Sequence, residues 1–496
     1  MVGDLGSVTG GLTQNSKRDA FPVHLPFLRV ANVYANELRL DQISEIGVQD
    51  SEVPRVLLEK GDLLVVEGNG SLDQIGRVAV WNGAIEPCLH QNHLIKVRFA
   101  PITIGRFALY WFLSSVGRDQ ITRVASSTSG LHTLSIAKVQ ALEMPLAPLR
   151  EQGRIAGAIE SYFTRLDDAV ATLERVERNL KRYRASVLKS AVEGRLVPTE
   201  AELAKQEGRD YEPASVLLER ILAERRRRWS ESGKKGKYQE PVPPNTTNLP
   251  NLPEGWCWAT VDQLITESLA NGRSVPTATQ GFPVLRLTAL KDGSVDLSER
   301  KIGAWTREEA ELYLVKLGDF LIARGNGSIR LVGRGGLLRQ SPDEVAYPDT
   351  LIRVRLSSAI LPGLFGQLWE SRWIRDQIEK KAKTTAGIYK INQTDLAECV
   401  LPLMPHSEQH RLLEEIERQT SFATTNTKSV LFALSRAGRL RQSILKWAFE
   451  GRLADQDPDD EPASVLLERI TREPERAKSA EATRQQRGTK RKQVRV

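Results

Sequence analysis

The chain has 496 residues, of which 27% are charged and 40% hydrophobic, and its formal net charge at pH 7 is +8. Its three cysteines, Cys88, Cys257 and Cys399, are far apart, which argues against a disulfide framework and against a zinc cluster. It shows no signal peptide and no apolar run long enough to cross a membrane, so we expect a cytoplasmic protein with no membrane partner.

The positive charge is concentrated near the C-terminal end. Residues 471–496 carry nine Lys or Arg and three Glu, so they account for +6 of the net charge and leave only +2 for the remainder. This basic tail is predicted to be disordered, and by itself it does not indicate a polyanion partner.

Residues 1–147 have the pattern of a mixed α/β domain. Leu63–Glu67, Arg77–Trp81 and Leu94–Phe99 are short apolar runs typical of strands, and Gly105–Ile121 is predicted to be helical. Gly68-Asn69-Gly70-Ser71 lies between the first two strands and predicts a hairpin loop. The alternative is a loop whose glycines allow close approach to a sugar-phosphate backbone.

A long helix is predicted from about Leu149 to Gly194. Apolar residues recur there at alternating steps of four and three, which is the seam of a helix that packs against another helix. At 1.5 Å per residue the helix is on the order of 65 Å long. Its seam contains Ile155, Ile159, Leu166, Leu173 and Leu180.

Nearly the whole chain repeats at a shift of 257 residues. The segments Pro145–Gln152 and Glu193–Leu196 recur as Pro402–Gln409 and Glu450–Leu453, and Gly68–Ser71 recurs as Gly325–Ser328. The chain is therefore an internal duplication with a second helix, whose seam is weakened by Gln419 and Asn426. The second seam contains Leu412, Ile416, Val430, Leu440 and Ile444.

A ten-residue segment is retained without change after each helix. It occupies Glu212–Ile221 and Glu461–Ile470, and it predicts a short amphipathic helix. The apolar face of that helix would bind a partner in both copies, or it would pack on the long helix of its own chain. The basic run Arg225–Arg228 is either a solvated face or a phosphate contact, and Pro241–Pro253 is a linker.

No constellation of catalytic or metal-binding residues is apparent. The chain has no Walker motif, no Asn-Pro-Pro-aromatic motif, no Gly-x-Ser-x-Gly elbow and no His-Glu-x-x-His. The six histidines do not correspond between the two copies, so structural or exposed histidines are expected rather than ligands. The sequence thus predicts a protein that is not an enzyme and binds no metal or cofactor of its own.

These motifs together resemble the specificity subunit of Type I restriction-modification enzymes. The carriers are the Pro-Leu-x-Pro-x-x-Glu-Gln starts, the Glu-Gly-Arg-Leu ends, the retained ten-residue segments and Leu252-Pro253-Glu254-Gly255-Trp256. The first copy begins at Met1 without its own Leu-Pro-x-Gly-Trp, which suggests a shortened or differently assigned start.

The resemblance implies a DNA sequence-recognition subunit that reads a bipartite double-stranded target, with one target recognition domain for each half. It also implies that two modification subunits, which carry S-adenosylmethionine and methylate adenine, dock on the helices. Restriction subunits that cleave DNA with ATP and Mg would join the complex. All of these cofactors are expected on the partner subunits.

The expected fold is mixed α/β (α+β), with two target recognition domains separated by two long antiparallel coiled-coil helices and a pseudo-twofold internal repeat. The predicted parts are 1–147 for the first domain, 148–196 for its spacer helix, 197–250 for the retained helix and linker, 251–404 for the second domain, 405–453 for its spacer helix and 454–496 for the short helix and tail.

The predicted DNA-binding residues lie in loops around the glycine turns and the Thr-Ser-Gly and Thr-Ala-Gly segments, where polar side chains can reach base edges and phosphates. A structural role is an open alternative for each of them. They are Asn69, Ser71, Arg77, Thr128, Ser129, His132, Arg324, Asn326, Ser328, Arg330, Arg334, Thr385, Tyr389 and Lys390, with Arg29 and Arg286 as weaker candidates.

Two other functions are open from the sequence. One is a recognition subunit of a Type IIB-like system, in which a single subunit combines methylase and nuclease. The other is a coiled-coil scaffold protein with no role on DNA. Exchange of residues 258–400 would leave the function of a scaffold unchanged.

Overall fold

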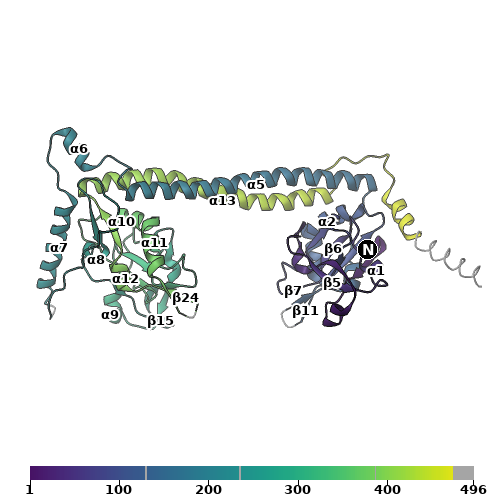
Figure 1. Cartoon of the computed structure of the whole chain (residues 1–496), viewed down its shortest axis with the longest axis horizontal. Coiled ribbons are helices and arrows are strands. Elements are labelled where there is room, and N and C mark those ends of the chain that lie inside the picture. Colours follow the sequence, from purple (N-terminus) through teal and green to yellow (C-terminus); the bar gives the residue numbers. More distant parts are fainter. Residues whose placement is uncertain (129–130, 234–235, 386, 473–496) are drawn as a thin grey trace, which may run out of the picture. The chain divides into compact units, whose positions relative to one another are not determined.

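The computed structural model describes residues 1–128, 131–233, 236–385 and 387–472. Its contacts divide the chain into two compact units. Unit 1 comprises Met1–Leu173 and the described residues from Leu431 onward, and unit 2 comprises Glu174–Val430. Each unit combines a mixed sheet domain with parts of two long helices, so the expected mixed α/β fold is confirmed (Figure 1). The predicted tail beyond residue 472 lies outside the described residues.

The elements of the first sheet domain belong to unit 1. They are β1 (Gly6–Gly10), β2 (Val23–Leu28), β3 (Val33–Tyr34), β4 (Glu37–Leu38), β5 (Ser44–Val48), α1 (Val53–Val56), β6 (Leu63–Val66), β7 (Gly68–Asn69), β8 (Val78–Val80), β9 (Leu89–His90), β10 (Leu94–Phe99), α2 (Ile104–Leu113), α3 (Ser115–Val124), β11 (Ser126–Thr128), β12 (Leu131–Thr133) and α4 (Ile136–Gln140). The long helix α5 (Leu149–Val192) follows and continues into unit 2.

Unit 2 contains the second sheet domain and the segment before it. Its elements are α6 (Glu200–Glu207), α7 (Ala214–Glu231), β13 (Cys257–Thr260), α8 (Val261–Leu264), β14 (Ala270–Asn271), β15 (Thr277–Leu285), β16 (Leu290–Lys291), β17 (Ser294–Val295), β18 (Arg300–Gly303), α9 (Arg307–Ala310), β19 (Phe320–Ala323), β20 (Gly325–Asn326), β21 (Gly335–Leu337), β22 (Leu351–Val354), α10 (Pro362–Trp369), α11 (Arg372–Lys381), β23 (Lys383–Thr385), β24 (Ile388–Lys390), α12 (Gln393–Ala397) and β25 (Val400–Leu403). The long helix α13 (His406–Phe449) leads back into unit 1.

The two sheet domains are built in the same way. The core sheet of unit 1 has the order β1-β10-β6-β8, and in unit 2 the neighbours β22, β19 and β21 follow the same order within a six-stranded sheet. β19 and β21 lie 257 residues after β6 and β8, as the sequence repeat requires. In unit 1, α2 lies between this sheet and the long helices (Figure 1), and its Phe107 and Tyr110 pack edge-on against Phe449 and Phe163.

The predicted helix Gly105–Ile121 is in fact two helices. α2 ends at Leu113, and the Ser114 hydroxyl accepts a hydrogen bond from the Gly117 backbone N–H, which caps the start of α3. Serine is a strong N-cap because its side chain satisfies a free backbone donor of the first turn. Ser371 caps α11 in unit 2 in the same way.

A buried ion pair holds each core sheet. In unit 1, Arg98 donates two hydrogen bonds of 2.7 Å to the carboxylate of Asp62, which is 0% exposed. In unit 2, Arg355 donates to Asp319 at 2.7 and 2.8 Å. These pairs explain why Gly-Asp recurs before β6 and before β19. In each unit the aspartate binds an arginine on or next to the neighbouring strand, β10 or β22, and so holds the two strands together.

A second buried cation lies beside each pair. The Lys96 Nζ donates to the carbonyls of Arg55 and Leu57 at 2.9 Å. Arg353, its equivalent, donates to those of Leu312 and Leu314. Burial lowers the pKa of Lys96 to about 8. Both cations tie the chain segment that precedes the Gly-Asp turn to the sheet.

In unit 1 the first half of α5 and the second half of α13 run antiparallel. Arg441 of α13 pairs with Asp167 and lies 4.9 Å from the ring centroid of Phe163, whereas Arg154, earlier in α5, pairs with Asp460 beyond the end of α13. Their apolar faces close the core of the sheet domain through Ile155, Ile159, Phe163, Ile444, Leu445 and Ala448.

Leu440 does not lie in the buried seam, because its side chain is 41% exposed. A strict heptad stripe drifts around a helix of 3.6 residues per turn, and here Arg441 faces α5 in its place. The other predicted seam residues fall into two groups. Ile155, Ile159, Leu412, Ile416, Val430 and Ile444 are buried, and Leu166, Leu173 and Leu180 are half-buried.

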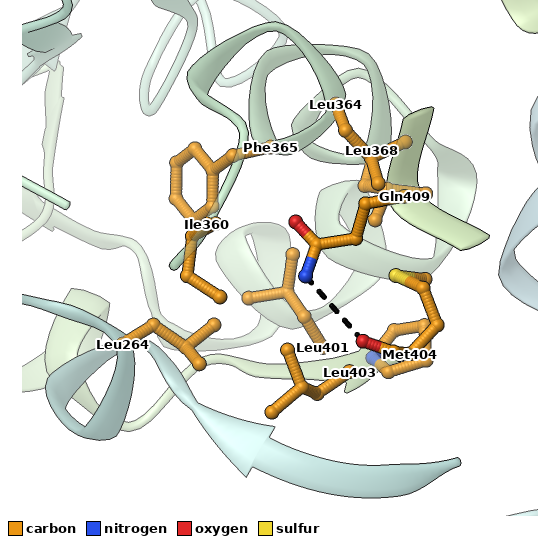
Figure 2. Close-up of a pocket in the computed structure, with 10 residues that line it drawn as sticks. Leu264, Ile360, Leu364, Phe365, Leu368, Leu401, Leu403, Met404 and Gln409 are labelled. Carbon is orange, nitrogen blue, oxygen red and sulfur yellow. Dashed lines mark hydrogen bonds between the residues drawn. The ribbon is translucent and has the colours of Figure 1, made fainter. Parts of the chain in front are cut away.

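In unit 2 the second half of α5 packs against the first half of α13. The Tyr183 hydroxyl of α5 donates to the Oε1 of Gln419 at 3.2 Å. Gln419, which interrupts the second seam, therefore has a hydrogen-bond partner on the other long helix. Ahead of α13, the Nε2 of Gln409 donates to the Met404 carbonyl, beside a small hollow lined almost wholly by apolar side chains (Figure 2). Gln152 makes the matching bond to Ala147 ahead of α5. The glutamine of the repeated motif therefore fixes the turn that starts each long helix.

The segment after each long helix returns to the start of the other one. In unit 2, Glu200 of α6 pairs with Arg411 at 2.7 Å, and in unit 1, Asp460 pairs with Arg154 at 2.6 Å. The retained ten-residue segments follow. Leu217 and Ile221 are buried in the core of unit 2, and Leu466 and Ile470 are buried in that of unit 1. The retained segments thus pack within their own chain, whereas Val216 and Val465 stay about half exposed.

Substitution of Asp319 by Asn is expected to destabilise unit 2 on the order of 3 kcal/mol, because it removes the buried carboxylate that accepts two hydrogen bonds from Arg355 and leaves that guanidinium only the half-exposed Glu267 as a charged partner. Chemical denaturation followed by tryptophan fluorescence measures this change. The matched control is Asp343→Asn, since that side chain is 88% exposed. Equal midpoints for the two variants would contradict the role of the buried pair.

Acid is expected to weaken unit 1 through His90, which is 0% exposed and whose pKa burial lowers to about 4. The unfolded chain takes up this proton near pH 6.5, so the contribution is complete above that pH and is lost as the pH falls towards 4. It amounts to about 3 kcal/mol at most. Denaturation from pH 7.5 to 4.5 should show a flatter profile for His90→Gln than for His24→Gln, which alters an exposed histidine.

Candidate nucleic-acid interface

The Gly-Asn-Gly-Ser segments do not form tight hairpin turns. In each unit the Gly-Asn pair is a short strand that leaves the core sheet and joins a small three-stranded sheet, ordered β11-β12-β7 in unit 1 and β23-β24-β20 in unit 2. β6 and β8 pair antiparallel, so the segment does connect the two strands of a hairpin as predicted. The additional short strand was not predicted, because its partner strand lies far along the chain. β7 and β11 lie in the part of unit 1 that is remote from the long helices (Figure 1).

Strand register brings the candidate residues together in a row across each small sheet. In unit 1 Asn69 pairs with His132, which pairs with Ser127. In unit 2 Asn326 pairs with Tyr389, which pairs with Thr384. Directly paired residues point to the same face of a sheet. Asn69 and His132 therefore share a face in unit 1, and Asn326 and Tyr389 share one in unit 2. We call these two pairs the reading rows, and each consists of an asparagine and a residue with a ring.

The asparagine of each reading row is oriented by its own loop. The Oδ1 of Asn69 accepts the Ser71 backbone N–H at 2.9 Å, and that of Asn326 accepts the Ser328 N–H at 3.2 Å. Neither Nδ2 group forms a hydrogen bond with a described residue. The amide thus keeps two donors available beside an aromatic or imidazole ring, and asparagine, like glutamine, can pair with the major-groove edge of adenine.

An arginine outside the predicted site fixes the loop that follows each asparagine. Arg118 of α3 donates to the carbonyls of Ile75 and Gly76, at 2.7 and 3.1 Å. Arg375 of α11 donates to those of Ile329 and Val332, at 2.7 and 2.6 Å. Gly76 and Gly333 have φ near +64° and +70°, and a Cβ there would clash with Ile121 or Ile378. The loop is therefore anchored to the domain through backbone atoms.

The remaining predicted residues are more scattered. Arg77 lies 4.6 Å from the ring centroid of Tyr34, away from the row, and Arg334 is exposed with its Nε bonded to the Arg330 carbonyl. Ser71 is exposed and Ser328 half-buried in the loop. Thr128 and Thr385 lie at the ends of β11 and β23, and Ser129 lies outside the described residues.

A hollow of about 430 Å³ in unit 2 adjoins the strand that leads to β20. Arg286 lines it together with Lys301, Asp349 and Thr350, and the Thr350 carbonyl accepts the Arg324 backbone N–H. Thr350 thus connects the wall of this hollow to Arg324, the residue that precedes β20.

Sequence reasoning missed three kinds of residue at this site. Arg118 and Arg375 carry a signal in the repeated Arg-Asp-Gln-Ile motif, although it does not reveal which atoms they bind. Lys383 carried no such signal, because the equivalent residue of the first copy is Ser126. The backbones of Ser127 and Thr384 pair with His132 and Tyr389, and only the strand register reveals this.

Within the described residues, no group of three or more His, Cys, Asp or Glu side chains is arranged to hold a metal ion. Burial raises the pKa of the Cys88 and Cys399 thiols to about 12 and that of Cys257 to about 11, so all three are poor nucleophiles. No described helix is long and apolar enough to cross a membrane.

The basic run of α7 is neutralised by nearby carboxylates. Arg225 pairs with Asp262 at 3.0 Å, and Arg226 and Arg228 pair with Glu240 and Glu224. These pairs favour a structural role over a phosphate contact.

Substitution of Arg375 by Lys is expected to loosen the loop between Ser328 and Gly333, since a lysine cannot donate to two carbonyls through a planar fork. Amide hydrogen exchange there should become about tenfold faster, equivalent to about 1.4 kcal/mol, which is the range of one lost hydrogen bond. Arg372→Lys on the same helix is the control, because that side chain is 68% exposed. Unchanged exchange in the Arg375 variant would contradict the anchoring role.

Comparison with known proteins gives one consistent result. The chain is 26% identical over 464 residues to the EcoKI specificity subunit of a Type I restriction enzyme from Escherichia coli K12, covering 91% of this chain and 89% of that protein. It is also 26% identical to the StySPI specificity subunit from Salmonella potsdam, with the same coverage of both chains. No family model matches the chain.

The fold is matched by a chain of a solved structure that concerns complex assembly and conformational transition of the type I R-M system. The TM-score is 0.58 with 16% identity, over 91% of this chain and 97% of that one. The resemblance predicted from the repeated motifs is thereby confirmed, and this chain is a relative of the specificity subunits of Type I restriction enzymes.

Proposed function

We propose that this chain is the DNA sequence-recognition subunit of a Type I restriction-modification complex. One sheet domain reads each half of a bipartite double-stranded target, with residues 1–147 forming the first recognition domain and residues 251–404 the second. The observation that carries this proposal is the pair of reading rows. The same arginine anchor recurs beside them in Arg118 and Arg375, while the row itself changes from Asn-His to Asn-Tyr.

A repeated scaffold with different side chains at one site suits two readers of different sequences. Base edges are distinguished by donors, acceptors and apolar groups in the major groove, which admits a narrow β-ribbon. Contacts to phosphates set the register without reading sequence. The reading rows supply the first kind of contact, and the arginines and lysines around them supply the second.

The chain acts in the cytoplasm without chemistry of its own in this proposal. Two modification subunits dock on the long helices and supply S-adenosylmethionine, and restriction subunits supply ATP and Mg for cleavage. Large apolar side chains stay exposed on α13, where Phe422 is 66%, Phe432 65% and Trp447 50% exposed. Exposed aromatic residues of this kind are typical anchors of protein interfaces, which supports docking there.

The target should appear as a two-part motif in the methylome of cells that express the chain with its modification partner, read by single-molecule sequencing. Replacement of residues 258–400 by the corresponding unit of another specificity subunit should change one half of the motif and leave the other half intact. A conservative change in the seam, such as Leu412→Ile, serves as control and should leave both halves unchanged. Methylation without sequence preference, or a motif that the exchange does not alter, would refute the proposal.

A further inference from the structure

The two small sheets differ sharply in charge at equivalent positions. In unit 2 four cations surround β20, β23 and β24, namely Arg324, Arg330, Lys383 and Lys390. Shifted by 257 residues, the same positions in unit 1 hold Glu67, Asp73, Ser126 and Thr133. One unit therefore presents four positive charges where the other presents two negative charges.

The four cations of unit 2, which we call the cationic set, are available to a ligand. Arg330, Lys383 and Lys390 are exposed and Arg324 is half-buried. None of the four side chains forms an ion pair or hydrogen bond with a described residue. By contrast, the basic run of α7 is largely neutralised within the chain. In unit 1, Glu67 instead lies 3.2 Å from His93.

The register places two of these cations directly opposite each other. Lys383 pairs with Lys390, and Lys390 pairs with Gly325, in the row next to the reading row. Like charges directly across a sheet destabilise it. An anion bound between them removes that cost, and Gly325 offers no side chain that would obstruct its approach. The equivalent row in unit 1 is Ser126, Thr133 and Gly68, which carries no such charge.

Adjacent rows of a sheet face opposite sides, so the lysine row cannot contact the atoms that the reading row contacts. Lysine is a flexible point charge suited to phosphate. A β-ribbon that turns its reading row towards base edges leaves its long lysines free to reach the flanking sugar-phosphate backbone.

We propose that the two units divide the binding of DNA unequally. The cationic set of unit 2 binds the sugar-phosphate backbone and supplies most of the electrostatic attraction, whereas the small sheet of unit 1 recognises its half of the target with little help from charge. This inference rests on the proposed function and adds that unit 2 makes the salt-sensitive contact.

The test measures how the affinity for DNA depends on salt. The full chain with its modification subunits is titrated onto a duplex that carries the target motif, and the dissociation constant is followed by fluorescence anisotropy over a range of KCl concentrations. Lys383→Ser with Lys390→Thr gives unit 2 the residues of unit 1. Each phosphate contact contributes about 0.9 to the slope of log K against log salt, so the slope should fall in magnitude by about 2.

The loss should be equal for the target duplex and for a scrambled duplex, because phosphate contacts carry no sequence information. The control is Lys205→Thr with Lys316→Ser, which removes two exposed lysines from α6 and from the turn before β19 of the same unit. Its slope should match that of the unaltered protein. All four lysines are exposed, and removal of Lys383 and Lys390 also removes their mutual repulsion, so the thermal unfolding temperature should not fall in either variant.

A second arm tests the asymmetry directly. Duplexes that keep only one half of the target should show a steeper salt dependence when the retained half belongs to unit 2. Adding Ser126→Lys and Thr133→Lys to the unit 2 variant should reverse the order. The inference is overturned if the two half-site duplexes give equal slopes, or if the variant and its control behave alike. In that event a preference for target over scrambled DNA still supports the proposed function, whose own failure would appear as the loss of that preference.

Discussion

Burial of the apolar stripes of α5 and α13 is the constraint on which the rest of this structure depends. Neither sheet domain closes its core with its own elements alone. The core of unit 1 includes Ile155 and Ile159 from α5 and Ile444 and Leu445 from α13, and that of unit 2 includes Leu188, Leu412 and Ile416. Each fully buried side chain of this size contributes roughly 2 kcal/mol, so loss of one helix end would expose the core of the domain.

The same constraint means that the core of unit 1 contains residues from both the first and the last part of the described chain. Its sheet domain is made first, but Ile444, Ala448 and Leu466, which complete its core, come from the last part of the described sequence. Contacts between residues so far apart are entropically costly to form and tend to form late. The ion pairs Arg154–Asp460 and Arg411–Glu200 then fix each long helix to the segment that follows the other one.

Much of this architecture was predictable because its signals are periodic or repeated. The heptad steps predicted both long helices, and the apolar runs predicted β6, β8 and β10. The break at Ser114 was missed because capping competes with helix propensity through one hydroxyl group. The strands β7 and β20 were missed because a two-residue strand has no local pattern and depends on a partner far along the chain. Among the candidate site residues, Asn69, His132, Asn326 and Tyr389 come together in the reading rows, whereas Arg77 lies against Tyr34. A seven-residue stripe could not show that Arg441 would displace Leu440 from the seam.

The anchoring of the loops by Arg118 and Arg375 has a consequence for how such a site can change over time. Both guanidinium groups donate to carbonyl oxygens of the loop, which every amino acid possesses, and among the described residues none of their hydrogen bonds goes to a side chain of the loop. Substitution of the loop side chains therefore leaves the hydrogen bonds from the two arginines in place. A lineage can acquire a new binding preference by small steps at the tip of the ribbon, without passing through variants that fail to fold.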